Sequence, residues 1–372
     1  MAGEASGDRL GAALMAGLKT LVPGIAFDGV GGPLMRAEGL TSRFPMDELS
    51  VMGLAEVLPR YPHLRRRMIE TATAVIETRP DVLITIDSPD FCLRLAAHVR
   101  RRRRIHTVHY VAPSVWAWRA KRAERMAPIV DQVLALLPFE PPYMRAAGMR
   151  CDFVGHPLVA EPLADAARIA RFRDEAGFGA APILLVLPGS RRSEVDRLAP
   201  VFGEALRRLA AKRPELRFVL PAAPAVAVRL RELTADWPEV AIVDGGDLDA
   251  KRAAFGAADA ALAASGTVSL ELAATNTPMV VAYDLSWLSW QIMRRMVRVD
   301  TVTLVNLIAG DRVVPEFLGP ACRPVPIADA LDTLLSAPGG QSAALTRTMD
   351  ALGRGGEPPG LRAARAVLDA VT

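Results

Sequence analysis

Short apolar runs of strand length alternate with amphipathic runs of helix length along the whole chain. The predicted strands cover residues 25–30, 82–87, 106–111 and 132–137 in the first half, and residues 183–187, 217–220, 240–243, 260–263 and 279–283 in the second. Strands that alternate with helices are typical of a doubly wound α/β architecture with parallel sheets. The pattern therefore predicts an α/β protein in which one structural theme occurs twice.

The two series of strands meet near residues 155–160. Gly155 and Pro157 interrupt the last strand of the first series, and a new helical segment starts beyond Pro162. A chain of 372 residues suits two domains of about 150 residues or slightly more, and two domains imply a cleft. We therefore expect domains at 1–156 and 157–354, followed by a C-terminal helix over 355–372 that can cross back to the first domain.

Residues 3–8, which read Gly-Glu-Ala-Ser-Gly-Asp, look like a loop between a strand and a helix. The helical period begins at Leu10 and continues through Leu14 and Leu18, but no strand precedes the loop. We interpret this as the loss of a first, central strand of about ten residues through a mis-assigned start or a truncation. If the chain is native as it stands, its first sheet should lack one strand.

Composition fits a folded protein that stays in the cytoplasm. Apolar residues make up 51% of the chain and charged residues 23%, which excludes disordered and fibrous classes. No run approaches the roughly 18 apolar residues of a membrane-spanning helix, and the N-terminus lacks the features of a secretory signal. Cys92, Cys151 and Cys322 are scattered, so we expect small buried hydrophobes without a disulfide or a metal.

The formal net charge is +4, a mild excess whose distribution is more informative than its size. Arg65, Arg66 and Arg67 form one cluster in the first half of the chain, and residues 100–104 form a second. Solvated helix ends and a surface that faces anions explain these clusters equally well. No nucleic acid is expected as a partner, because no recognised nucleic-acid-binding module surrounds the clusters.

Three segments lie where an α/β sheet binds ligands, beyond the carboxyl end of a strand and before a helix. The first contains Gly189, Ser190 and Arg191 after an apolar strand. Gly189 lets the backbone approach a ligand, Ser190 offers a hydroxyl, and Arg191 can pair with a diphosphate through two hydrogen bonds. The alternative is a capped turn with a solvated arginine, and the local sequence does not decide between the two.

The second segment contains Ser265, Gly266 and Thr267, again between a strand and a helix. Thr267 and Glu271 are four residues apart and share one helical face. This spacing can place a hydroxyl and N–H groups on a phosphate while the carboxylate accepts both hydroxyls of a ribose. A Ser or Thr cap followed by a helical glutamate is the simpler explanation of the same residues.

The third segment follows a strand in the first half of the chain. Asp87 ends a strand that is otherwise apolar, so we expect its carboxylate to point into the cleft, where it could take a proton from an acceptor hydroxyl. Asp90 is more easily explained as the N-cap of the following helix. Residues 29–33 superficially resemble a dinucleotide-binding loop, but they lack the full G-x-G-x-x-G motif and support NAD only weakly.

Further motifs extend along most of the chain. The segments described above cover residues 86–91, 187–191 and 265–267. The further motifs are residues 1–8, Met52-Gly53, residues 109–119 (His-Tyr-Val-Ala-Pro-Ser-Val-Trp-Ala-Trp-Arg) and Asn306-Leu307. Together they resemble the lipid-A-disaccharide synthase family, glycosyltransferase family 19, and the proline and two-tryptophan segment is especially specific. The departure lies at the start, since the family has extra residues before the Gly-Glu-Ala-Ser-Gly-Asp loop.

The resemblance implies the GT-B fold of two Rossmann-like domains, with the nucleotide-sugar donor held by the second domain and the acceptor approached from the first. It implies an inverting enzyme that transfers 2,3-diacylglucosamine from UDP-2,3-diacylglucosamine to 2,3-diacylglucosamine 1-phosphate. The products are a β-1,6-linked lipid A disaccharide 1-phosphate and UDP. Asp87 would deprotonate the acceptor hydroxyl, and Arg191 would stabilise the charge that grows on the diphosphate.

The resemblance also implies a set of residues around the substrates. The expected contacts to the UDP phosphates and ribose are Gly189, Ser190, Ser265, Gly266, Thr267 and Glu271. Glu4, Ser6 and Asn306 are expected to contact substrate through hydrogen bonds. An arginine and helix N-termini can replace a cation in this arrangement, so no metal or other cofactor is expected.

Both substrates carry acyl chains, so we expect a surface that meets lipid without crossing it. The candidates mix apolar residues with cations and are Met52, Leu54, Val57, Leu58, Arg65, Arg66 and Arg67. Core packing is the alternative for this segment. We expect a cytoplasmic protein that associates peripherally with the anionic surface of the inner membrane, and a homodimer is compatible with the sequence.

Two other functions stay open on the sequence alone. Another GT-B enzyme that uses UDP-sugars, such as the peptidoglycan N-acetylglucosaminyltransferase or a UDP-sugar epimerase, would act on a different acceptor or on none. A catalytically silent module that binds UDP and lipid is the second, although the intact Asp87 and Arg191 argue against it.

Overall fold

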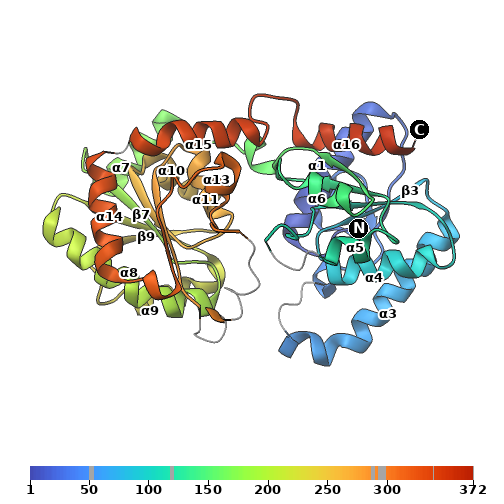
Figure 1. Cartoon of the computed structure of the whole chain (residues 1–372), viewed down its shortest axis with the longest axis horizontal. Helices are drawn as coiled ribbons and strands as arrows, with labels where there is room; N and C mark the ends of the chain where they lie inside the picture. Colours follow the sequence, from blue (N-terminus) through green and yellow to red (C-terminus); the bar gives the residue numbers. More distant parts are fainter. Residues whose placement is uncertain (50–53, 118–120, 286–289, 292–298, 338, 372) are drawn as a thin grey trace. The chain divides into compact units, whose positions relative to one another are not determined.

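A computed structural model describes residues 1–49, 54–117, 121–285, 290–291, 299–337 and 339–371, with the backbone alone over 54–58. The chain forms two units (Figure 1). Unit 1 contains Met1–Ala160 and Leu352–Thr372, and unit 2 contains Glu161–Ala351. Each unit has its own parallel sheet with helices packed against it, so the predicted α/β class with parallel sheets is confirmed.

The sheet of unit 1 has four parallel strands in the order β3 (Val82–Ile86), β4 (His106–Tyr110), β5 (Gln132–Ala135) and β6 (Arg150–Phe153). Beside β3, Ala2 forms a parallel bridge with Ile86, and its N–H donates to Val30 O at 2.9 Å. Val30 follows β1 (Asp28–Gly29), which pairs in parallel with β2 (Thr41–Ser42). Residues 1–2 therefore connect the β1–β2 pair to the main sheet.

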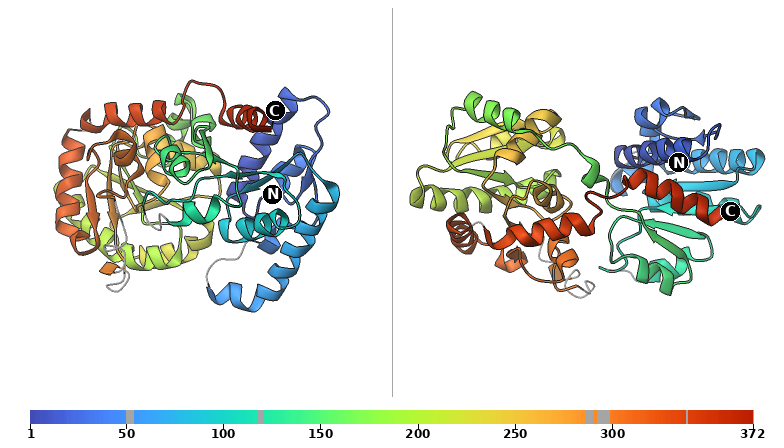
Figure 2. Two further views of the ribbon diagram at one scale, coloured as in Figure 1. Left: turned by 45° about the vertical axis from the view of Figure 1, so that its right-hand side comes forward. Right: turned by 90° about the horizontal axis from the view of Figure 1, so that it is seen from above.

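Helices from both ends of the chain cover the sheet of unit 1. They are α1 (Ala5–Leu21), α2 (Pro33–Ala37), α3 (Leu54–Thr78), α4 (Pro89–Arg100), α5 (Lys121–Met126), α6 (Pro141–Ala146) and α16 (Pro359–Val371), with 3-10 turns η1 (Met46–Leu49) and η2 (Pro157–Ala160). α16 lies against α1 (Figure 2), where a Cβ on Gly17 would be 2.7 Å from Gly360 O. Gln132 of β5 also donates to Ala366 O at 2.8 Å, so α16 is an integral part of unit 1.

The sheet of unit 2 has six parallel strands in the order β12 (Glu316–Leu318), β11 (Met279–Tyr283), β10 (Ala260–Ala263), β7 (Ile183–Leu187), β8 (Arg217–Ala222) and β9 (Val240–Asp244). Every residue of β7 and β10 is buried, as is typical of parallel strands covered on both faces. The core between β7 and the helix that follows it, α8 (Arg192–Lys212), includes Leu184, Leu198 and Phe202.

The helices of unit 2 alternate with these strands. They are α7 (Ala166–Glu175), α8 (Arg192–Lys212), α9 (Ala227–Leu233), α10 (Leu248–Ala257), α11 (Val268–Ala274), α13 (Leu304–Ala309), α14 (Pro324–Ser336) and α15 (Gly339–Ala351), with 3-10 turns η3 (Pro224–Val226) and η4 (Gly319–Ala321). Since each crossover returns the chain to the same edge of the sheet, all the strand-to-helix loops lie at the carboxyl ends of the strands.

Several local predictions from sequence are wrong. The strand predicted over 25–30 is limited to Asp28–Gly29, because Ile25 and Phe27 pack against the core from outside a strand. β6 and β12 were not predicted, since charged residues interrupt their short apolar patterns. α1 begins at Ala5, before the apolar period that starts at Leu10. The N-cap of α4 is Ser88, so Asp90 lies inside the first turn of the helix.

Candidate functional site

In unit 2, the strand order reverses between β7 and β10. The chain runs from β7 through β8 and β9 on one side and then returns to place β10 on the other side of β7. Leu187 and Ala263, the last residues of β7 and β10, are paired directly. Open α/β sheets bind ligands at such a switch point, outside the carboxyl ends of the strands. The two glycine-containing segments predicted to hold a nucleotide therefore follow neighbouring strands at the favoured position.

The loop after β7 surrounds a carboxylate from its own helix. Gly189 has a φ of +113°, a conformation that favours glycine, and Arg191 is the N-cap of α8. The Glu194 carboxylate accepts from the backbone N–H groups of Ser190 at 3.2 Å and Arg191 at 3.3 Å, and from Arg191 Nη1 at 3.1 Å. Sequence analysis missed Glu194, although a glutamate three residues after an N-cap has the spacing of a capping box.

The loop after β10 leaves its backbone open. Gly266 has a φ of +143°, and a Cβ placed there would have no neighbour within 4 Å. The half-buried Ser265 donates its hydroxyl to Val302 O at 3.5 Å, whereas Gly266 and Thr267 are exposed. Thr267 is the N-cap of α11, but its side chain makes no capping hydrogen bond. Its hydroxyl can therefore act as a donor or acceptor to a phosphate.

Glu271 lies in α11, and the structure gives it a partner that the sequence did not indicate. Its carboxylate is 2.5 Å from Lys251 Nζ of α10, and both side chains are 29% exposed. Lys251 also lies over the ring of Phe255, with 5.3 Å between the ammonium and the ring centroid. A ribose bound by Glu271 would share the carboxylate with this lysine.

Asn306 is 1% exposed, and its amide is used inside unit 2. It donates to Thr301 Oγ1 at 3.2 Å and to Val314 O at 2.9 Å, and it accepts from Val314 N–H at 2.9 Å. Glu316 holds the same turn by accepting from Thr303 N–H at 2.7 Å. These contacts position the 301–303 turn beside Ser265, and the substrate contact expected for Asn306 from the sequence stays a prediction.

Unit 1 has a corresponding switch point between residues 1–2 and β3. β1 and β2 lie on one side of Ala2, and β4 to β6 lie beyond β3 on the other. Asp87 lies in the loop after β3, and Ser6 lies in the first turn of α1, which follows residues 1–2. The Ser6 hydroxyl donates to Asp87 Oδ2 at 3.5 Å, so the structure brings these two predicted site residues together.

The backbone at this edge of unit 1 is strained. Asp87 and Ser88 have φ values of 52° and 41°, and Val111, which follows β4, has a φ of 83°. Such values are rare outside glycine, cost about 1–3 kcal/mol each, and cluster at functional sites. The N–H of Asp87 donates to Tyr110 O at 2.9 Å, and Asp87 Oδ1 accepts from Ser88 N–H at 2.9 Å. These bonds fix the direction of the Asp87 carboxylate.

The start of α1 combines a predicted site residue, Glu4, with a residue that was missed, Asp8. Glu4 is the half-buried N-cap of α1, and its side chain makes no capping hydrogen bond. Asp8 is 2% exposed and accepts from the backbone N–H groups of Gly32 at 2.8 Å, Leu34 at 2.9 Å and Met35 at 3.0 Å. The Asp8 carboxylate thus fixes the start of α2, which gives the conspicuous Gly-Glu-Ala-Ser-Gly-Asp segment a structural role as well.

Two buried titratable side chains support the neighbouring loops of unit 1. Glu140 is 4% exposed and accepts from Leu137 N–H at 3.0 Å and from Trp116 Nε1 at 3.3 Å, and burial raises its pKa to about 7. His109 Nδ1 is 2.8 Å from Thr85 Oγ1, and burial lowers the pKa of this histidine to about 4. Glu140 therefore ties the proline and two-tryptophan segment to the loop after β5.

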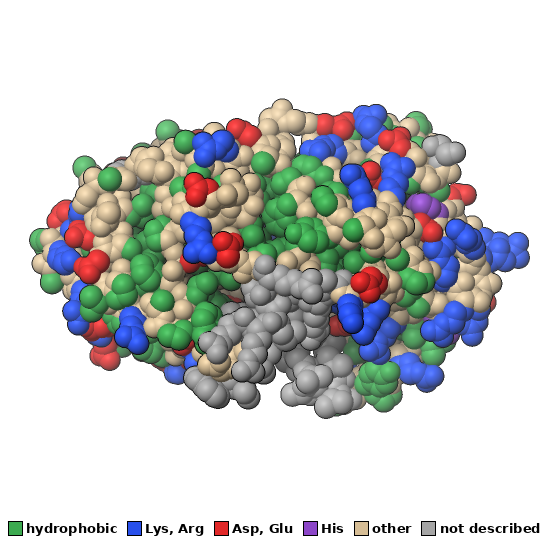
Figure 3. Space-filling model, viewed as in Figure 1, with side chains coloured by type: hydrophobic (Ala, Val, Ile, Leu, Met, Phe, Trp, Pro, Cys, Tyr) green, Lys and Arg blue, Asp and Glu red, His purple; other side chains and the backbone are tan. Residues whose placement is uncertain are grey.

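α3 carries most of the residues expected to face a membrane. Arg65 and Arg66 are exposed, but Arg67 is bound to Glu48 at 2.7 Å and lies over the ring of Phe44. Figure 3 shows Lys and Arg side chains gathered over the α3 and α4 region of unit 1. The candidates outside the described residues or side chains are Met52, Leu54, Val57 and Leu58. No helix of the described residues is both long and apolar enough to cross a membrane.

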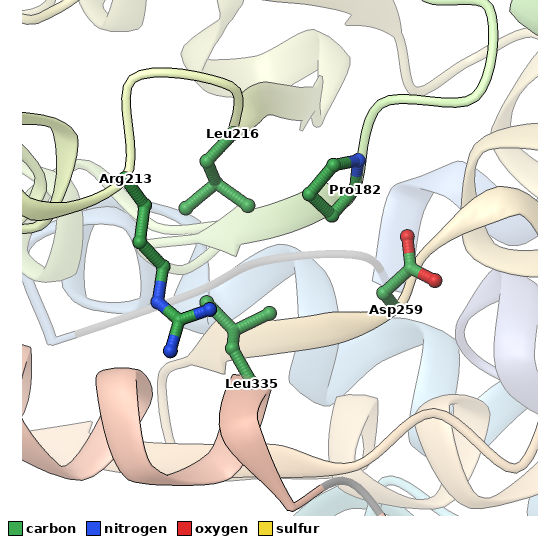
Figure 4. Close-up of a pocket in the computed structure, with 5 residues that line it drawn as sticks. All are labelled: Pro182, Arg213, Leu216, Asp259 and Leu335. Atoms are coloured by element: carbon green, nitrogen blue, oxygen red, sulfur yellow. The ribbon is translucent and has the colours of Figure 1, made fainter.

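A hollow of about 220 Å³ lies elsewhere in unit 2 (Figure 4), lined by Pro182, Arg213, Leu216, Asp259 and Leu335. Pro182 and Asp259 immediately precede β7 and β10, so the hollow lies at the amino ends of these strands. Arg213 is bound to Asp332 Oδ1 at 2.6 Å. Because α/β sheets bind ligands at the opposite edge, we do not assign the substrate site to this hollow.

Comparison with known sequences gives a consistent result. A family model described as lipid-A-disaccharide synthetase matches residues 1–352. A lipid-A-disaccharide synthase of Ruegeria pomeroyi is 63% identical over 376 residues, which cover 99% of this chain and 94% of that protein. A second, from Rhodospirillum centenum, is 49% identical over 378 residues, which cover 100% of this chain and 94% of that protein.

Solved structures with a similar fold have much lower sequence identity. UDP-GlcNAc 2-epimerase from Neisseria meningitidis bound to UDP-GlcNAc has a TM-score of 0.67 and 13% identity, over 100% of this chain and 98% of that one. The S. aureus MnaA–UDP co-structure has a TM-score of 0.64 and 13% identity, over 99% and 93% of the two chains. At this identity the likeness bears on the fold alone, and it confirms the GT-B fold expected from the sequence.

Proposed function

The chain belongs to the lipid-A-disaccharide synthetase family, and from this premise we propose that it is an inverting glycosyltransferase of lipid A biosynthesis. It transfers 2,3-diacylglucosamine from UDP-2,3-diacylglucosamine to 2,3-diacylglucosamine 1-phosphate, which forms the β-1,6-linked disaccharide 1-phosphate and UDP. The observation that carries the proposal is the location of the predicted substrate loops. In unit 2, two of these segments follow the neighbouring strands β7 and β10 at the switch point of the sheet, and in unit 1 they follow β3 and the residue that bridges to it, Ala2.

Unit 2 binds the UDP part of the donor in this proposal. Arg191 is 67% exposed at the N-cap of α8, where it can pair with the diphosphate through two hydrogen bonds. The exposed Gly266 and Thr267 offer a backbone that a phosphate can approach closely and a hydroxyl that makes no capping hydrogen bond. Glu271, held by Lys251, is the proposed acceptor of the ribose hydroxyls.

Unit 1 supplies the base in the proposed reaction. The Asp87 carboxylate takes the proton of the acceptor 6-hydroxyl as the hydroxyl oxygen forms a bond to the anomeric carbon of the donor. The bond from this carbon to the diphosphate oxygen breaks on the opposite face, and its electron pair leaves with UDP. The configuration is therefore inverted, and Arg191 stabilises the charge that develops on the leaving diphosphate.

The acyl chains of both substrates call for access from a membrane, and we propose the anionic cytoplasmic face of the inner membrane as the partner surface. The exposed Arg65 and Arg66 support this role, whereas Arg67 is committed to Glu48. Sedimentation with vesicles that contain anionic phospholipid tests it. The Arg65→Glu/Arg66→Glu double variant should lose binding at physiological salt, and undiminished binding would remove these arginines from the interface.

The transfer reaction is tested by UDP release from purified protein given both acylated substrates in detergent. We expect UDP release that depends on the acceptor, with equal amounts of disaccharide 1-phosphate detected by mass spectrometry. Release that is equally fast without acceptor would contradict the proposed transfer. Conversion of the UDP-sugar to an epimer would instead support the activity named for the Neisseria meningitidis structure.

A further inference from the structure

Glu194 lies inside the loop to which the proposed function assigns the donor diphosphate. Its Oε2 accepts from the backbone N–H groups of Ser190 at 3.2 Å and of Arg191 at 3.3 Å. Its Oε1 accepts from Arg191 Nη1 at 3.1 Å and from the Tyr283 hydroxyl at 3.4 Å. The side chain is only 13% exposed, so the carboxylate is largely enclosed by these donors.

The loop fits closely around this carboxylate. A Cβ on Gly189 would lie 2.7 Å from Glu194 Oε2 and 2.8 Å from Glu194 Cβ. Burial and the neighbouring Glu194 raise the pKa of Tyr283, which therefore remains a neutral donor at pH 7. Backbone N–H groups after a glycine, together with a guanidinium, are also the donors that bind phosphate oxygens in proteins. Glu194 thus satisfies, from within the chain, the groups that a diphosphate would use.

A carboxylate and a diphosphate cannot hold the same donors at once, because each N–H makes one strong hydrogen bond and the two anions repel at contact distance. We propose that Glu194 is a specificity-determining residue of the donor site, whose carboxylate holds the 189–191 loop in the free enzyme and is displaced by the donor diphosphate. This inference rests on the proposed function. Uridine carries no charge and cannot displace Glu194, so the competition separates diphosphates from uncharged nucleosides.

The same competition gives Glu194 a part in the reaction cycle. In the free enzyme, Arg191 lies at the N-cap of α8 and is bound to the Glu194 carboxylate. When the donor binds, the diphosphate takes the place of this carboxylate on Arg191. After transfer, the return of the carboxylate to these donors displaces UDP. Loss of the negative charge should therefore strengthen UDP binding, which is the opposite of what is expected for a residue that contacts the ligand favourably.

The test is UDP binding by Glu194→Gln, measured by isothermal titration calorimetry. Glutamine keeps the capping-box acceptor and the size of the side chain, but it removes the charge. We expect UDP to bind on the order of tenfold more tightly than to the wild type, and uridine binding to be unchanged. Glu204→Gln is the matched control, since Glu204 lies on the same helix and pairs with Arg207 and Arg208 away from the loop. It should leave UDP affinity within twofold of the wild type.

Tyr283→Phe gives an independent measurement if the glutamine variant does not fold. It removes one donor from the Glu194 carboxylate but keeps the charge, so UDP affinity should rise by about two- to threefold. UDP binding that is unchanged or weaker in both variants would overturn the inference. That result would leave the proposed function intact as long as the wild type binds UDP far more tightly than uridine. If the wild type does not discriminate between UDP and uridine, the proposed donor site itself is wrong.

Discussion

The switch points of the two units have the same place in the fold but different backbones. In unit 1, the positive φ values directly after β3 and β4 belong to Asp87, Ser88 and Val111, none of which is glycine. In unit 2, the corresponding loops obtain positive φ from Gly189 and Gly266. A base needs a side chain held in one direction, and a strained backbone can hold it so. A diphosphate needs close access to backbone N–H groups, which glycine allows without strain.

The largest effect is expected from Asp87→Asn, which keeps the shape of the side chain and removes the proposed base. Turnover should fall by about 10²–10⁴-fold, while UDP affinity stays within twofold because the nucleotide is assigned to unit 2. UDP release and calorimetry measure the two quantities separately. Asp90→Asn is the matched control, since Asp90 is 96% exposed and only pairs with Arg122 at 3.4 Å. Similar turnover in the two variants would remove Asp87 from the chemistry.

Arg191→Ala should affect both binding and rate, in contrast to Asp87→Asn. We expect kcat/KM to fall on the order of a hundredfold and UDP to bind more weakly, because the proposed function places the guanidinium on the diphosphate both before and during the reaction. Arg192→Ala is the control. Its guanidinium is adjacent in sequence and 78% exposed, and it lies 3.6 Å from Asp196 instead of Glu194. Equal losses in the two variants would indicate a general charge effect.

A pH-dependent effect should be specific to unit 1. The pKa of Glu140 is raised to about 7 from its ordinary value, so the folded state binds a proton that the unfolded state releases between about pH 4.5 and 7. Unit 1 should therefore lose stability as the pH rises through this window, by about 1–3 kcal/mol. His109 and His156, whose pKa values burial lowers to about 4, contribute the opposite slope, because their stabilising neutral forms are lost as the pH falls from about 6.5.

Glu140→Gln separates these two slopes. Urea unfolding of the variant, followed by tryptophan fluorescence at pH 5 and pH 8, should show greater stability at pH 8, because only the histidine slope remains. In the wild type, the difference in free energy of unfolding between pH 8 and pH 5 should be smaller than in the variant, or of the opposite sign. An identical pH dependence in the two proteins would show that Glu140 does not titrate as its burial implies.

The smallest effects should come from substitutions at the positive-φ residues themselves: glycine for Ser88 in unit 1, and alanine for Gly266 in unit 2. Ser88→Gly should stabilise unit 1 by about 0.5–1 kcal/mol, since it relieves the φ of 41° and removes a buried hydroxyl without a partner among the described residues. Turnover should nevertheless fall, because Asp87 loses its fixed direction. Gly266→Ala should destabilise unit 2 by about 1 kcal/mol through φ alone, since its Cβ meets nothing within 4 Å. Urea unfolding measures both changes in the free energy of unfolding. If the two changes have the same sign, the contrast between the two units is contradicted.

The sequence predicted most reliably the central apolar strands of unit 2. β7, β10 and β11 begin and end at the predicted residues, because an uninterrupted apolar run has one explanation in a parallel sheet. β6 and β12 escaped prediction because Arg150, Asp152 and Glu316 serve as hydrogen-bonding anchors within very short strands. Such contacts depend on tertiary structure and leave no periodic signal.

In the candidate site, too, positions along the chain could be predicted from the sequence, but tertiary contacts could not. The positions of the loops around Asp87, Arg191 and Thr267 could be predicted, since each follows an apolar run and precedes a helix. Their partners could not, because Lys251 reaches Glu271 from another helix and Asp8 binds backbone groups that lie 24 to 27 residues further along the chain. Asn306 is a further example, because its amide partners Thr301 and Val314 could not be predicted from the sequence.

The packing of α16 against α1 also affects the order in which the protein can be assembled. The face of α1 around Gly17 is covered by residues near Gly360, which leave the ribosome only after the whole of unit 2. At about 5–20 residues per second, synthesis of the intervening segment takes roughly 10–40 s. Unit 2 can therefore mature on the nascent chain during an interval in which unit 1 still exposes an apolar surface, and chaperones have time to bind that surface.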